Sequence, residues 1–209
     1  MPGTGPCPKR TSVCRSHLAI APLLPEPEAV ARPPRDLAPG IQHVGVSAAG
    51  AGLYFRDDLD RATWLRLFVA TVSRYQWQPV AVCLLSTHWH AILKIQDGSL
   101  ARGMHRLVGG YSRRFNDRHA RAGYLVRSRY WSKRKDSPTA VLAAYRYVAR
   151  NPVAAGLVER PEDWQWSSYG AAVGVSDLFG FVDPGVVLGE FGSTRPAQVR
   201  GLRRFVDAG

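Results

Sequence analysis

Two histidines one residue apart are the first residues in this chain whose types and spacing could do chemistry. His88 and His90 lie in the run 87–95 (THWHAILKI), which alternates as a β-strand does. Because strand side chains point to opposite faces with period two, both imidazoles share one face, and Trp89 belongs to a second, wholly apolar face. Two neutral imidazoles so placed can bind one cation. The alternative is an ordinary strand in which each ring finds its own hydrogen-bond partner, so a third ligand is needed to decide.

A tyrosine and an asparagine four residues apart lie on a predicted helix. The helix runs from a Ser-Pro pair at 137–138, a capping hydroxyl followed by proline at the first helical position, to about residue 150. Pro152 is expected to end it, because proline disfavours helical geometry in the preceding residue. Tyr147 and Asn151 then share one face, with small residues behind them. Tyr145 falls about 200° round the helix in the core stripe, so only Tyr147 is available to react.

Two imidazoles and an amide oxygen together make a mixed nitrogen and oxygen site with open positions. Such a site accepts Mg²⁺ or Mn²⁺ when phosphate oxygens supply further ligands. A cation there would offset charge on a phosphate, and a nearby tyrosine hydroxyl could attack the phosphorus to give a covalent phosphotyrosine. Since the pKa of a free phenol is about 10, the cation and nearby basic side chains would have to favour phenolate.

The chain is basic, and its basic residues are concentrated in one stretch. Lys and Arg number 28 against 16 Asp and Glu in 209 residues, a formal charge of +12, which suits a phosphate-rich partner. Residues 101–135 contain eleven Lys or Arg and one acid, so this stretch is either a solvated face or a phosphate track, and the near absence of carboxylates favours the track. The candidate DNA contacts are Arg113, Arg114, Arg118, Arg127, Arg129, Lys133, Arg134 and Lys135.

Three aromatic residues lie among these charges and could stack on unpaired bases of a single strand. They are Tyr124, Tyr130 and Trp131. If residues 124–133 form a strand, either Tyr130 or Trp131 must face the core instead.

Several classes of protein are excluded. Three cysteines without a C-x-x-C pair argue against a disulfide scaffold. No apolar run reaches the roughly 18 residues of a membrane span, and the Pro-rich start lacks the apolar centre of a signal peptide. We expect a soluble, cytoplasmic protein without a membrane partner.

The elements expected around the site are strands alternating with amphipathic helices. Strands are predicted at 41–47, 77–85 and 88–95, with His43 an ordinary strand residue, and helices from Asp58 or Asp60 to Tyr75 and from Ser99 onward. The expected organisation is a disordered Pro-rich arm (1–39), a catalytic domain (40–173) and a tail with a short basic helix (174–209).

At these residues the chain resembles the REP-associated tyrosine transposases, within the single-tyrosine HUH transposases. The resemblance begins at about Ala31 and runs to the C-terminus, and the order and spacing of its short motifs make it specific. The motifs are Ala31-Arg32-Pro33, Phe55-Arg56-Asp57-Asp58, His88-Trp89-His90, Gly103-Met104-His105-Arg106-Leu107, Phe115-Asn116, Arg129-Tyr130, the run 147–158 (YVARNPVAAGLV) and the aromatic run 164–169 (WQWSSY).

The resemblance implies a fold, a reaction and a role for each site residue. The implied fold is α+β, a ferredoxin-like antiparallel sheet with helices packed on it. His88 and His90 are the paired ligands of Mg²⁺ or Mn²⁺, Asn151 is the third ligand, and Tyr147 attaches to the 5′ phosphate of a cut single strand and leaves a 3′ hydroxyl. The implied substrates are hairpin-forming repeats (REP-like), and relatives include both monomers and homodimers.

The chain departs from the family pattern at two motifs. Leu85-Ser86-Thr87 stands where Met-Pro-Asn is usual, and Ala49-Gly50-Ala51 stands where Arg-Gly-Asn is expected. The metal ligands survive both changes, but loss of the arginine could weaken guidance of the DNA. Val30, before Ala-Arg-Pro, is a candidate alternative start position.

Three functions follow as hypotheses. The first is a metal-dependent transposase-type DNA strand-transferase. The second is a domesticated protein that binds DNA or RNA hairpins without cutting them, and the third is a metal hydrolase without a covalent step.

Overall fold

The computed structural model describes residues 38–126 and 128–208, and these residues belong to one compact unit. Residues 1–37 of the predicted arm, including the candidate start at Val30, lie outside the described residues. The candidate DNA contact Arg127 lies outside them as well. Among the described residues, no helix has both the length and the apolar composition that crossing a membrane requires.

A four-stranded antiparallel sheet forms the centre of the fold. Its strands are β1 (Gly40–Ser47), β2 (Gln78–Leu84), β3 (His88–Ile95) and β4 (Trp131–Lys135), in the order β2-β3-β1-β4. With α1 (Asp58–Tyr75) between β1 and β2, and α2 (Leu100–Arg118) between β3 and β4, the order of elements is βαββαβ. The α+β prediction of a ferredoxin-like antiparallel sheet is therefore confirmed, and both central strands, β3 and β1, are long enough to carry a site.

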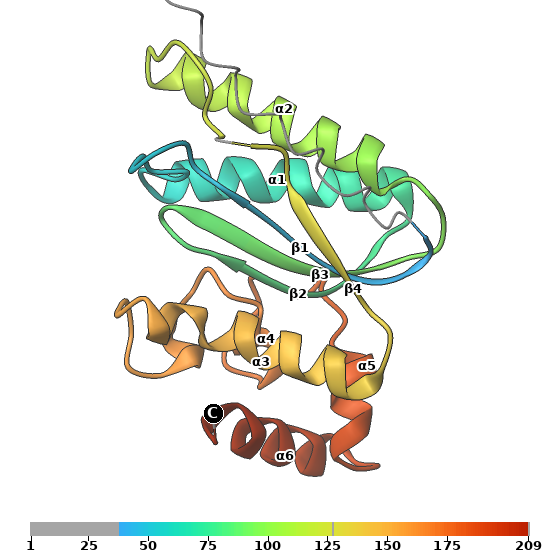
Figure 1. Ribbon diagram of the computed structural model, residues 1–209. Helices are drawn as coiled ribbons and strands as arrows, with labels where there is room; N and C mark the ends of the chain where they lie inside the picture. Colours follow the sequence, from blue (N-terminus) through green and yellow to red (C-terminus); the bar gives the residue numbers. More distant parts are fainter. Residues whose placement is uncertain (1–37, 127, 209) are drawn as a thin grey trace, which may run out of the picture. The chain divides into compact units, whose positions relative to one another are not determined.

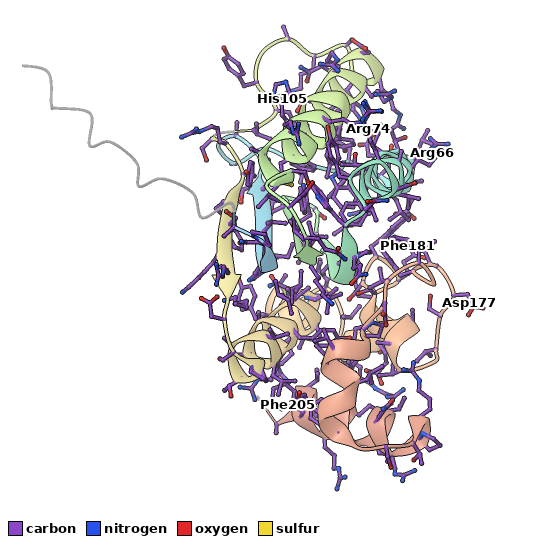
Figure 2. The ribbon with its side chains drawn as sticks, turned by 90° about the vertical axis from the view of Figure 1, so that its right-hand side faces the viewer. Arg66, Arg74, His105, Asp177, Phe181 and Phe205 are labelled. Carbon is purple, nitrogen blue, oxygen red and sulfur yellow. The ribbon has the colours of Figure 1, made fainter. Side chains whose placement is uncertain are left out.

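One face of the sheet is covered by α1 and α2 (Figure 1). Trp89 and the other apolar alternate residues of β3 point into this layer, as the alternation predicts, and pack with aromatic side chains of both helices. Helix α1 is capped by Asp57, the residue before its first turn, whose side chain accepts a hydrogen bond from the Asp60 backbone at 3.0 Å. Arg66 and Arg74 of α1 are exposed on the outside of this layer (Figure 2).

The opposite face of the sheet is covered by the remaining helices. Helix α3 (Pro138–Ala154) packs mainly on β2 and β3, and the residues after 173 add apolar side chains such as Val187 and Leu202 to the same core. The segment predicted as a tail thus packs within the compact unit. Between α3 and this segment lie η1 (Pro161–Asp163) and α4 (Tyr169–Ala172). The segment itself contains α5 (Gly185–Leu188), η2 (Gly189–Phe191) and α6 (Arg195–Asp207), and α6 contains the predicted basic helix.

Aromatic residues after α3 hold this layer to the sheet. The indole of Trp164 donates to the Leu84 carbonyl at 3.0 Å, and that of Trp166 donates to the Asp58 carboxylate at 2.8 Å. Tyr169 is fully buried in the second core. These contacts fix the C-terminal half of the chain against β2 and α1.

The prediction that α3 ends before Pro152 is wrong, because the helix continues to Ala154. Proline in the last turn removes only one intrahelical hydrogen bond, at a point where the helix is about to lose its bonds in any case. The Ala155 N–H still bonds to the Asn151 carbonyl at 2.9 Å, and the Asn151 side chain donates to the Tyr147 carbonyl at 3.2 Å. Asn151 is therefore held in helical geometry on the face that also carries Tyr147.

The start of α2 agrees with the prediction, whereas the strand near residue 130 differs from it. Ser99 precedes α2 as expected but makes no side-chain cap bond, because its hydroxyl instead accepts from the Trp77 indole at 2.8 Å. The conditional strand at 124–133 is shorter and later, since β4 begins at Trp131. Tyr130 is buried in the first core, so Trp131 points to the opposite face.

Candidate active site

The two histidines of β3 lie side by side on the face opposite the aromatic layer. Their ring centroids are 5.0 Å apart. His90 is only 5% exposed, and both of its ring nitrogens are buried without a hydrogen-bond partner. His88 is partly buried, and its Nδ1 lies 2.9 Å from the Thr87 hydroxyl. A buried imidazole that lacks both partners is unusual in a folded protein, which makes His90 a candidate ligand residue.

A third histidine joins the pair, which the sequence did not indicate. The antiparallel register sets Gly45 of β1 opposite His90, and His43, two residues away, comes onto the same face. The His43 ring is buried, with its centroid 5.3 Å from that of His90 and its Nε2 without a partner. The expectation that His43 is an ordinary strand residue is corrected. Its alternation with Gly45 was visible in the sequence, but the pairing of β1 with β3 was not.

All three imidazoles have a lowered pKa, mainly because burial disfavours the charged form. Burial, with a smaller contribution from Lys135 and Lys133, lowers the pKa of His43 to about 4. Burial and the neighbouring histidines lower that of His90 to about 3. The pKa of His88 is lowered by burial, and a hydrogen bond with the Asn151 side chain opposes this effect. The rings are therefore neutral at pH 7, the form that binds a metal ion.

Helix α3 presents Tyr147 beside these rings. The Ser137 hydroxyl caps the helix by accepting from the Ala140 backbone at 3.2 Å, with proline at the first helical position, as predicted. Tyr145 is 1% exposed in the core, whereas Tyr147 is 55% exposed, as their spacing on the helix predicts. The Tyr147 ring centroid lies 5.3 Å from that of His90 and 5.8 Å from that of His43.

Asn151 stands one turn further along α3 and closes the group. Its side chain is nearly buried and interacts both with the Tyr147 carbonyl and with His88. The unpaired nitrogens of His90 and the amide of Asn151 beside His88 fit a nitrogen and oxygen ligand set for a divalent cation. Among His, Cys, Asp and Glu side chains of the described ranges, no cluster of three is placed to bind a metal ion. Because the two imidazoles are neutral at pH 7 and an amide carries no charge, a site built on His88, His90 and Asn151 has no net protein charge, which suits anionic oxygens from a ligand.

Strand β4 adds an indole and two cations to the same face. The register pairs Trp131 with Gly45 and Lys133 with His43. The Trp131 ring centroid lies 4.7 Å from that of His43 and 5.6 Å from that of His90. Lys133 is exposed and Lys135 is partly buried, with its pKa lowered by burial and by Lys133. These two lysines follow the histidine face along the edge of the sheet.

The candidate DNA contacts on α2 lie in a different layer from the histidines. Arg113 and Arg114 are exposed on this helix, which packs on the aromatic face. Arg118 forms ion pairs with Asp57 at 2.6 Å and with the buried Asp60 at 2.5 Å, and thereby ties the end of α2 to the start of α1. The structure thus gives Arg118 a structural role across the two helices.

The remaining candidates lie at β4 or just before it. Arg129 is exposed, and Arg134 pairs with Asp136. The described residues of the stretch 101–135 are therefore divided between two sides of the sheet, with those of α2 on the aromatic side and Trp131 and Lys133 of β4 on the histidine face.

Comparison with known proteins finds a likeness to a solved structure. No protein-family model and no curated protein sequence matches this chain. A solved structure of a REP-associated tyrosine transposase bound to a REP hairpin matches it with a TM-score of 0.57, over 68% of this chain and 83% of that chain, at 16% sequence identity. At this identity the likeness establishes a shared fold.

Proposed function

We propose that this chain is a metal-dependent transposase-type endonuclease and strand-transferase that acts on single-stranded DNA at hairpins. The observation that carries the proposal is the exposed Tyr147 phenol beside the paired neutral imidazoles His88 and His90, with Asn151 one helical turn away. The fold shared with a transposase that binds a REP hairpin supports the substrate class. The proposed partner is therefore hairpin DNA with a single-stranded flank.

The proposed reaction is an in-line displacement at phosphorus. The Tyr147 oxygen forms a bond to the phosphorus and gives up its proton to solvent, while the bond from phosphorus to the 3′ oxygen of the preceding nucleotide breaks. That oxygen takes a proton and leaves as a 3′ hydroxyl, and the strand remains attached as a 5′-phosphotyrosine. Attack by another 3′ hydroxyl reverses the step and completes strand transfer without any oxidant or energy-rich co-reactant.

Each residue has a defined task in this scheme. His88, His90 and Asn151 would hold Mg²⁺ or Mn²⁺, which supplies positive charge against a non-bridging phosphate oxygen. The buried position of His90 keeps water from one side of the phosphate, and α3 fixes the distance between Tyr147 and the imidazoles. The exposed Lys133 draws the phosphate backbone along β4.

A covalent-capture experiment tests the proposal. The protein is incubated with end-labelled hairpin oligonucleotides that carry single-stranded flanks, with Mn²⁺ or with chelator, and separated under denaturing conditions. We expect a labelled protein adduct that requires the cation, is lost in Tyr147→Phe, and is retained in Tyr124→Phe, a matched control because Tyr124 is 88% exposed on another surface.

Two results would count against the proposal. An adduct that persists in Tyr147→Phe would remove the assignment of the nucleophile. Tight hairpin binding that gives no adduct with any flank, and that is indifferent to chelator, would instead identify a hairpin-binding protein that does not cut.

A further inference from the structure

The three aromatic residues among the basic stretch have different environments. Tyr130 is 7% exposed, belongs to the first core and lines a groove beside α2, so little of its ring is accessible to a ligand. Tyr124 is highly exposed and lines the same groove with Met104 and Val108. Trp131 is 40% exposed and lies on the histidine face. Only Trp131 combines an accessible ring with a position at the candidate active site.

The indole of Trp131 packs directly against the backbone of Gly45. A Cβ atom added at Gly45 would lie 2.6 Å from Cζ2 and 2.7 Å from Cε2 of the indole, so only glycine leaves room for the ring. The edge of the indole meets His43 with an interplanar angle of 79°. Because Gly45 and His43 both contact the indole, its orientation is fixed before any ligand binds. A fixed ring loses less conformational entropy when a ligand binds.

The exposed part of this ring lies within one nucleotide of the proposed chemistry. Trp131 and Tyr147 both lie against His90, with ring centroids 5.6 Å and 5.3 Å from it. A phosphate beside His90 and Tyr147 therefore brings the base of an adjoining nucleotide within reach of the indole. Lys133, two residues along the same face of β4, is placed for the next phosphate.

We propose that Trp131, packed against Gly45, stacks on the unpaired base of a nucleotide that adjoins the phosphate attacked by Tyr147. The inference rests on the proposed function and adds to it a base-binding position that fixes where along a single strand the cut falls. A flat aromatic surface accepts all four bases, so this position sets the register of the strand and leaves the choice of sequence to other contacts.

The test measures binding without cutting. Fluorescence anisotropy in chelator, with Tyr147→Phe as the parent, reports the affinity for hairpins in which each flank nucleotide in turn is made abasic. Because stacking of one base is worth about 1–3 kcal/mol, we expect one abasic position to weaken binding by about 5- to 150-fold in the parent. In Trp131→Ala the same substitution should change binding by less than twofold, because the stacking partner is already absent.

Two further variants separate stacking from a general loss of structure. Trp131→Phe keeps a ring and should restore part of the sensitivity to the abasic position. Gly45→Ala keeps the indole but displaces it from its position against the β1 backbone, so it should reduce the sensitivity to the abasic position. Tyr124→Ala should leave that sensitivity unchanged. Thermal unfolding of each variant shows that it is folded.

The outcomes distinguish this inference from the proposed function. If the parent binds hairpins but its abasic profile is flat, or is the same in Trp131→Ala, the stacking role is refuted and the proposed function stands. If the parent binds no single-stranded or hairpin oligonucleotide at all, the proposed function itself fails.

Discussion

The two faces of the sheet differ in the side chains that they bury, and β3 shows this difference most clearly. One face buries apolar aromatic rings, and the other buries histidines whose ring nitrogens lack partners. Trp89 is fully buried against Trp64, with ring centroids 4.8 Å apart, inside a layer closed by α1 and α2. His90, the next residue, is buried on the other face with both ring nitrogens unpaired. Because the aromatic layer provides extensive apolar burial, the fold can hold polar groups without partners on its other side. The residues proposed for chemistry thus lie on one face of the sheet, beside the second apolar core, and the aromatic layer lies on the other.

The largest expected effect comes from substituting β3 on its two faces. Trp89→Ala removes a fully buried indole and should lower the free energy of unfolding by about 3–5 kcal/mol. His90→Gln, one residue away, should have a much smaller effect on stability, because no hydrogen bond is lost. Chemical denaturation of both variants checks this, and equal losses would contradict the division between the two faces.

Acid should destabilise the histidine face selectively in metal-free protein. The folded-state pKa is about 4 for His43 and about 3 for His90, below the ordinary 6.5, so the unfolded chain binds more protons. Stability should therefore fall as pH decreases from about 6.5 toward 4, by on the order of 2–3 kcal/mol per histidine.

Denaturation curves in chelator between pH 7 and pH 4 measure this loss. His43→Asn should remove part of it, and the exposed His105→Asn on α2 (Figure 2) is the matched control. A pH dependence that is identical in wild type and His43→Asn would show that the buried imidazoles do not cause it.

On each face a tryptophan packs against a glycine, Trp77 against Gly103 and Trp131 against Gly45. The two glycines therefore give a matched pair of substitutions. A Cβ at Gly103 would lie 2.3 Å from the buried Trp77 ring, which has no room to move, so Gly103→Ala should cost about 1–3 kcal/mol of stability. At Gly45 the ring is half exposed and can swing outward, so Gly45→Ala should cost less stability but weaken DNA binding. Thermal unfolding and anisotropy together check the pair, and the opposite pattern would contradict the comparison.

The smallest expected effects distinguish a structural cation from a DNA-binding one. The Arg118 hydrogen bond helps to lower the pKa of Asp57 to about 2, so Arg118→Ala should lower the melting temperature and leave the salt dependence of binding unchanged. Lys133→Ala should leave the melting temperature unchanged and reduce the salt slope by about 1. Salt titrations of hairpin binding check both variants, and a reduced slope in Arg118→Ala would return it to the DNA contacts.

Local patterns in the sequence predicted much of the fold and part of the candidate site. Alternation placed His88 and His90 on the face opposite Trp89, and helical spacing separated Tyr145 from Tyr147. These features depend on neighbours within one element, which is why a single sequence reveals them.

The features that sequence missed depend on contacts between distant elements. His43 joins the site only because β1 pairs with β3, and Arg118 pairs with carboxylates about sixty residues earlier in the chain. Helix α3 continues through Pro152 because proline is tolerated in a last turn, where few hydrogen bonds remain to be lost. Neither the strand order nor the ion pairs across helices leave a local pattern.

The most direct test of the central claim is to locate the covalent bond. The adduct formed with a hairpin oligonucleotide and Mn²⁺ is digested with nuclease and protease, and the modified peptide is sequenced by mass spectrometry. The account predicts a 5′-phosphonucleotide on Tyr147 and an unmodified Tyr145 in the same peptide. Modification of another residue, such as the exposed Tyr124, would contradict it.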